Sequence, residues 1–117
     1  MSRQALFVVS GDPRTSARPA EAIRIAAGVG AWRKVAITLY LRDAAVLALS
    51  EWVDGFVDED NYTRYLPLLG ELGRPIYAQA GNPLLSELGE SPLAYEELAE
   101  GPLAELAARQ DFLVYFD

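Results

Sequence analysis

Apolar and polar residues follow one another along the chain in blocks that predict alternating strands and helices. Residues 5–12 (ALFVVSGD) are a short apolar run closed by turn-forming residues, which is typical of a buried strand. Residues 17–31 then repeat apolar side chains at helical spacing, with Ala22, Ile25 and Val29 on one face. This order predicts the first half of a βαβ unit, whose helix packs on a parallel sheet.

The middle of the chain continues the alternation. Residues 34–41 (KVAITLYL) predict a second strand, because branched residues suit a buried, pleated surface. The mixed aromatic and acidic stretch 51–61 predicts a loop or flap. Helical spacing returns at Tyr62, and Pro67 leaves open whether that helix starts late or is kinked.

The last third predicts the remaining elements. Residues 76–79 predict a third strand, and residues 95–98 fit either a short strand or part of a helix. Residues 102–109 are helical in pattern, and residues 112–116 (FLVYF) predict a final buried strand. Four strands, or five, alternate with helices. The sequence therefore predicts an α/β fold, a three-layer α/β/α sandwich with a mainly parallel sheet, as one domain over residues 1–117.

Polar and turn-forming residues predict where several helices begin and end. Asp43 is expected to cap a short helix over residues 44–49. Gly73 is a C-terminal cap for the helix that precedes the third strand. Asn82 as N-cap and Pro83 at the first helical position predict a helix start directly after that strand.

Composition restricts the function more than it suggests one. The chain has 17 acidic and 10 basic residues, and its net charge of −7 disfavours nucleic acid and membrane surfaces as partners. It contains no cysteine and no histidine, so any acid–base chemistry falls to carboxylates, tyrosines or Lys34. No apolar run suits a signal peptide or a membrane span, so a cytoplasmic location is expected.

One cluster of acidic residues stands out, formed by Asp54, Asp58, Glu59 and Asp60. Several carboxylates together can bind Ca²⁺ or Mg²⁺, but the spacing here does not match an EF-hand loop. A solvated acidic loop is the favoured interpretation. No metal ion and no cofactor is expected.

The ends of the predicted strands supply the candidate ligand site. Carboxyl ends of parallel strands meet at one edge of an open sheet, and ligands of α/β proteins bind there. Arginine side chains and the amides of a helix start favour an anionic or amide-bearing ligand. The candidate residues are Ser10, Gly11, Asp12 and Arg14 after the first strand, Tyr40, Arg42 and Asp43 after the second, and Gln79, Gly81 and Asn82 after the third.

Each of these residues also has an ordinary structural explanation. Asp12 precedes a proline in a common turn pair, Asp43 and Asn82 are helix caps, and Arg42 can pair with a neighbouring carboxylate. Residues 11–20 (GDPRTSARPA) contain neither of the glycine patterns that bind phosphate. The set therefore favours a binding site over a catalytic one and disfavours nucleotide binding.

Four stretches combine apolar runs and turns in a characteristic order. They are residues 11–28 (GDPRTSARPAEAIRIAAG), 34–49 (KVAITLYLRDAAVLAL), 74–84 (RPIYAQAGNPL) and 101–117 (GPLAELAARQDFLVYFD). Together they resemble the DsrE/DsrF-like (DsrEFH) superfamily of sulfur-relay proteins. The resemblance implies a small cytoplasmic α/β domain that assembles into trimers or hexamers.

The same resemblance implies which functions this chain could have. Active members carry a cysteine just after the third strand, which accepts and hands on a persulfide sulfur; the matching residues 79–82 contain no thiol. The favoured function is a non-catalytic member that acts through oligomerisation and binds a small ligand or partner at the sheet edge. One alternative is a structural subunit of a sulfur-relay complex with cysteine-bearing paralogues. Another is an enzyme of a different class, with Asp12 as acid or base and Arg14 or Arg42 holding an anion.

Aromatic residues gather in and beside the irregular segment. Such a group exceeds what a small monomer usually exposes to water, so some members are predicted in a subunit interface. The alternative is that they fold back over the sheet as core. The four residues are Trp52, Phe56, Tyr62 and Tyr65.

Overall fold

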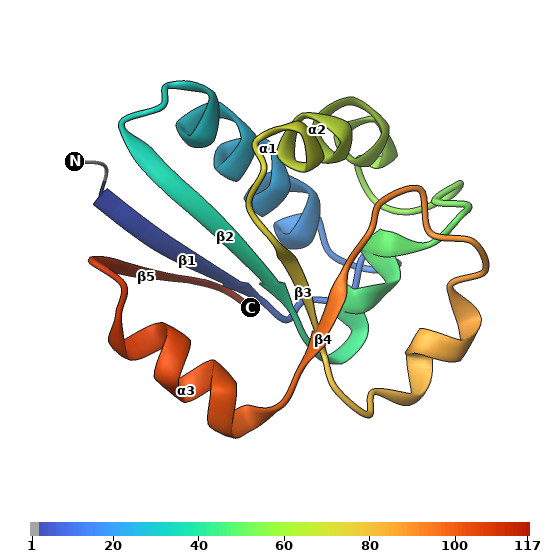
Figure 1. The fold of residues 1–117 in the computed structure, drawn as a ribbon. Helices are drawn as coiled ribbons and strands as arrows, with labels where there is room; N and C mark the ends of the chain where they lie inside the picture. The colour runs from blue at the N-terminus through green and yellow to red at the C-terminus, as the bar shows by residue number, and fades with distance from the viewer. Residues whose placement is uncertain (1–2) are drawn as a thin grey trace.

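A computed structural model describes residues 3–117 of the chain. Five strands pair in parallel, in the spatial order β4-β3-β2-β1-β5 (Figure 1). This sheet confirms the predicted α/β fold class, and the ambiguous stretch 95–98 supplies the fifth strand. The strands are β1 (Arg3–Val9), β2 (Val35–Leu41), β3 (Ile76–Gln79), β4 (Glu96–Leu98) and β5 (Phe112–Phe116).

Helices cover both faces of the sheet. The helices α1 and α2 pack on one face, and α3 crosses the other on its way from β4 to β5 (Figure 1). Two 3-10 helices, η1 and η2, follow β2 and β3 and pack on each other. Their bounds are α1 (Arg18–Ala31), η1 (Asp43–Leu49), α2 (Glu59–Glu71), η2 (Pro83–Glu87) and α3 (Glu100–Ala108).

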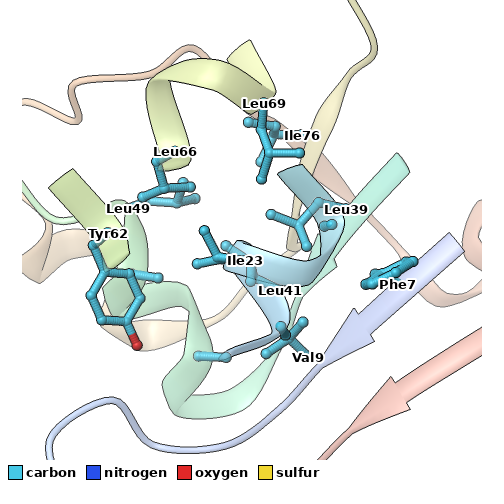
Figure 2. Close-up of a cluster of buried hydrophobic side chains, with 14 of the residues drawn as sticks. Phe7, Val9, Ile23, Leu39, Leu41, Leu49, Tyr62, Leu66, Leu69 and Ile76 are labelled. Atoms are coloured by element: carbon cyan, nitrogen blue, oxygen red, sulfur yellow. The ribbon is translucent and has the colours of Figure 1, made fainter. Parts of the chain in front are cut away.

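The larger core lies between the sheet and the pair of helices α1 and α2. Alternate residues of the central strands face it, among them Phe7, Val9 and Leu39, as the period of two in a strand requires. Figure 2 shows these side chains together with Ile23 of α1 and Leu66 of α2. No helix within residues 3–117 is long and apolar enough to cross a membrane.

The core under α3 is much smaller. Leu6, Val8 and Tyr40 are its buried members, and Tyr77 and Leu103 are among the half-buried residues that pack against them. Because α3 has nine residues, it covers less of the sheet than the two longer helices on the opposite face do.

The last strand corrects a prediction, because most of β5 is exposed and Phe116 is its one buried residue. It pairs with β1 on one side and forms an edge of the sheet, and Phe112, Leu113 and Tyr115 are 49%, 43% and 54% exposed. An apolar run indicates that a strand is hydrophobic. How much of the strand is buried depends on the position of the strand in the sheet.

The predicted loop 51–61 also extends too far toward the C-terminus, because its last residues belong to a helix. The helix α2 begins at Glu59 and continues through Pro67 to Glu71. Gly73 follows it with φ +76°, the left-handed conformation expected of a glycine that closes a helix.

Candidate functional site

The predicted site residues lie at the carboxyl edge of the sheet, in separate groups. The first group ties the end of the chain to β1. Ser10 donates from Oγ to Asp117 Oδ1 (3.1 Å) and from its N–H to Phe116 O (2.9 Å). A Cβ on Gly11 would lie 3.2 Å from the Pro19 ring, so a glycine lets the start of α1 approach closely. Ser10 and Gly11 therefore have structural roles here.

Asp12 and Arg14 form a second group, as a bidentate ion pair. Arg14 Nε lies 3.0 Å from Asp12 Oδ1, and Nη2 lies 3.0 Å from Oδ2. These hydrogen bonds lower the pKa of the Asp12 carboxyl and raise the pKa of the Arg14 guanidinium. Asp12 is therefore ionised at neutral pH and poorly suited to act as a general acid or base. The positive charge of Arg14 is already paired with the carboxylate of Asp12.

A network of side-chain amides forms the third group, at the end of β3. Gln79 Oε1 accepts hydrogen bonds from the backbone N–H of Asp43 (2.9 Å) and from Asn82 Nδ2 (3.0 Å). Asn82 Nδ2 also donates to Asp43 O (3.0 Å), and Asn82 Oδ1 accepts from the N–H of Leu84 (2.9 Å). The last bond confirms Asn82 as the N-cap of η2. The network holds β3 against the start of η1.

Asp43 is not the predicted cap. Its own φ is +54°, and η1 begins at this residue with Arg42 in the N-cap position and no side-chain cap. The backbone N–H of Asp43 bonds to Gln79 instead, a residue 36 positions away in the chain. A contact at that separation leaves no local signal in the sequence.

The remaining candidates differ in how accessible they are. Gly81 has φ +76° and donates its N–H to Glu97 Oε1 (3.3 Å). Arg42 is half-buried, and its Nε is buried with no hydrogen-bond partner among residues 3–117. Tyr40 is 1% exposed, and burial raises the pKa of its hydroxyl. Tyr40 thus belongs to the core under α3.

Two shallow depressions lie beside the η1–η2 pair at this edge. One has a volume of about 380 Å³ and is lined mainly by the amide network. The other has a volume of about 280 Å³ and brings Arg14 together with Glu51, Trp52, Phe56 and Glu87. The second depression joins the loop after β1 to the segment after η1 and to η2.

Glu51 and Glu87 were not predicted as site residues. The backbone N–H of Glu51 donates to Leu88 O (2.8 Å), which brings the segment after η1 beside the end of η2. Neither carboxylate forms an ion pair within the described part of the chain. This juxtaposition depends on the packing of η1 against η2, so local patterns could not reveal it.

The four aromatic residues of the predicted interface differ in exposure. Trp52 is 72% exposed, and Phe56 and Tyr65 are half-buried. Tyr62 is 1% exposed and packs in the larger core (Figure 2). Its ring lies edge-on to Phe56, with the ring centroids 6.1 Å apart. Tyr62 is therefore a core residue and is not accessible to another subunit, whereas the side chain of Trp52 is exposed to solvent.

The acidic cluster lies at the start of α2. Asp58, Glu59 and Asp60 share a depression there with Arg24 and Arg64. Across residues 3–117, no three acidic side chains gather closely enough to hold a metal ion.

The parallel sheet and its flanking helices define an α/β fold, and the comparison with solved structures supports a DsrE-like fold. A solved structure with this fold, the crystal structure of the YchN protein from E. coli, matches with a TM-score of 0.78. The match covers 99% of this chain and 100% of that chain, at 20% sequence identity, which shows a common fold and no more. No protein-family model matches the chain. No curated protein matches it by sequence.

Proposed function

We propose that this chain is a non-catalytic binding protein with a DsrE-like fold, which assembles with copies of itself and holds a small ligand or partner at the carboxyl edge of the sheet. The amide network carries the non-catalytic part of this proposal. By the resemblance to the DsrE/DsrF-like superfamily, Gln79 and Asn82 lie in the stretch in which its active members carry a cysteine. Their polar atoms are bound within the chain. They support the loop without offering a nucleophile.

The depression around Trp52 supports a preference for a neutral or positively charged group. Its one arginine, Arg14, is paired with Asp12, which weakens the case for an anionic ligand. Glu51 and Glu87 have no ion-pair partner within residues 3–117, and an exposed indole face attracts cations. An amine or guanidinium group, free or on a partner protein, fits these three side chains.

Native mass spectrometry of gently purified protein tests assembly and bound mass together. We expect a trimer or a hexamer, and a bound species that leaves on denaturation. A cysteine-bearing DsrE-like protein as the bound species would favour the structural subunit of a sulfur-relay complex. A strict monomer at micromolar concentration with no bound mass would contradict the proposal.

Tryptophan fluorescence tests the site itself. The chain has two tryptophans, so the Trp32→Phe variant leaves Trp52 as the only indole. We expect saturable emission changes with arginine methyl ester or spermidine and none with acetate or phosphate. The double variant Glu51→Gln/Glu87→Gln should weaken the response about tenfold, by loss of charge-assisted contacts.

Glu71→Gln/Glu105→Gln is the matched control, because it makes the same change in net charge at exposed residues outside this depression. Equal weakening by both double variants would mean that the response reports overall charge. No saturable response to either amine would contradict the assignment of an amine-binding site.

A further inference from the structure

The two edges of the sheet are built differently. The β4 edge is three residues long and carries Glu96 and Glu97, and charge on a short edge strand discourages pairing with another strand. The β5 edge is five residues long and has no charged residue and no proline. Figure 1 shows no strand beyond β5 on its outer side. The β5 edge therefore lacks the usual protection.

The backbone of β5 is ready to accept a further strand. Ser10 donates its N–H to Phe116 O, so Phe116 turns its polar backbone groups toward β1. Backbone groups alternate in direction along a strand, so the N–H and C=O of Val114 also point toward β1. The N–H and C=O of Leu113 and Tyr115 point outward, away from β1. Their side chains, 43% and 54% exposed, both project on the face that α3 covers.

We propose that a second copy of this chain pairs with β5 through its own β5, antiparallel, about a two-fold axis at Val114. In that register Leu113 faces Tyr115 of the second copy as a hydrogen-bonded pair, and the symmetry forms it twice. The result is a continuous ten-stranded sheet with a cluster of leucine and tyrosine side chains between the two α3 helices. This inference rests on the self-association proposed above and identifies one of its surfaces.

The absence of charge on β5 favours a second copy of this strand over a basic partner, because the strand offers such a partner no carboxylate. The chain carries −7, so two copies repel over most of their surface, and the five consecutive uncharged residues of β5 form a stretch without like charges. The strand is also fixed at both ends. Asp111 accepts from the N–H of Gln4 (2.7 Å), and Asp117 accepts from Ser10 Oγ (3.1 Å). In the proposed register, the carboxylate of Asp111 lies opposite that of Asp117 in the second copy. Both carboxylates already accept hydrogen bonds within their own chain.

Few side chains are involved, so the pairing buries less than the roughly 1,600 Å² of a standard interface. We therefore expect association in the micromolar range, dependent on concentration. A two-fold contact of this kind fits a dimer or a hexamer made of three such pairs, and it does not by itself produce a trimer.

Amide hydrogen exchange on the whole chain tests the register. Protection of the Leu113 and Tyr115 amides should rise with protein concentration, whereas the Val114 and Phe116 amides stay protected throughout by β1. Leu113→Lys should weaken association at least about tenfold, because an edge lysine blocks strand pairing. Leu68→Lys is the matched control, because Leu68 is a leucine on α2 with the same 43% exposure. It should change the strength of self-association less than about twofold.

Three results would overturn the inference. If the protein is oligomeric by mass while the Leu113 and Tyr115 amides exchange rapidly and Leu113→Lys assembles normally, copies meet elsewhere. Self-association would then stand without this surface. If these amides become protected only when another protein is added, the edge serves a different partner. A monomer at every concentration would remove both the pairing and the proposed assembly, and the Trp52 titration would still report on ligand binding.

Discussion

Nδ2 of Asn82 lies 3.0 Å from Oε1 of Gln79, so two side chains three residues apart close the turn that follows β3. The same amide reaches the backbone of η1, and Asn82 is at the margin of full burial, with 9% of its surface exposed. The carboxyl edge of the sheet is thus held together by neutral hydrogen bonds.

Replacing Asn82 by alanine should destabilise the fold by about 1–2 kcal/mol, because η2 loses its cap and Gln79 loses a donor. Urea unfolding followed by circular dichroism measures this change. Ser86→Ala is the control, since Ser86 is an exposed residue of the same helix whose hydroxyl bonds only to Pro83 O. It should change the stability by less than about 0.5 kcal/mol. Equal effects would show that the amide network adds nothing.

Two glycines of α1 should respond in opposite ways to alanine. Gly28→Ala meets no atom within 4 Å and should stabilise the protein by up to about 1 kcal/mol through helix propensity. A Cβ on Gly30 would lie 2.5 Å from Leu72 Cδ1, beside the end of α2. Gly30→Ala should therefore be less stable than Gly28→Ala by about 1–3 kcal/mol. Thermal unfolding compares them, and equal stabilities would show that Leu72 moves aside freely.

Tyr62→Phe removes a hydroxyl that is buried without a hydrogen-bond partner among the described residues. Burial raises the pKa of this hydroxyl, so it stays neutral over the accessible pH range. The variant should match or exceed the wild type in stability by up to about 1 kcal/mol, since an unsatisfied buried hydroxyl is costly. A clear loss of stability in urea would instead indicate that the hydroxyl is satisfied by buried water.

Asp12→Asn keeps the shape of the side chain and removes the charge that pairs with Arg14. The folded-state pKa of Asp12 is lowered, so its contribution is present above the unfolded pKa and is lost as pH falls through the folded value. The variant should be slightly less stable than wild type at pH 7. The difference should begin to shrink near pH 4, the unfolded pKa, and vanish only below the lowered folded-state pKa. Arg14→Gln should reproduce this dependence. A difference that stays undiminished at pH 2 would assign the effect to something other than the ion pair.

Local patterns predicted most of the framework, because each strand is bounded by turn residues and the first helix has one apolar face. The bounds of β3 and β5, the cap at Asn82 and the closing Gly73 agree with the structure. All of these depend on interactions between residues a few positions apart.

The errors arise where distant residues decide the outcome. Asp43 has a positive φ and an N–H bound by Gln79, a residue far away in the sequence. Most of β5 is exposed because the strand lies at the end of the sheet order. The candidate site shows the same limit. Tyr40 lies beneath α3, while Glu51 and Glu87 meet Trp52 through the contact of η1 with η2.

The small core beneath α3 has a consequence for how the molecule opens. The final helix and strand are held by the small core of Leu6, Val8 and Tyr40, by the packing of Val114 and Phe116 at the larger core, and by one row of hydrogen bonds to β1. The helices α1 and α2 enclose the main body of apolar residues. Segments with little buried apolar contact unfold locally before the rest of a protein. The C-terminal eighteen or so residues should therefore separate as a unit while the four other strands keep their native arrangement. In that partly unfolded state β1 becomes the edge of the sheet.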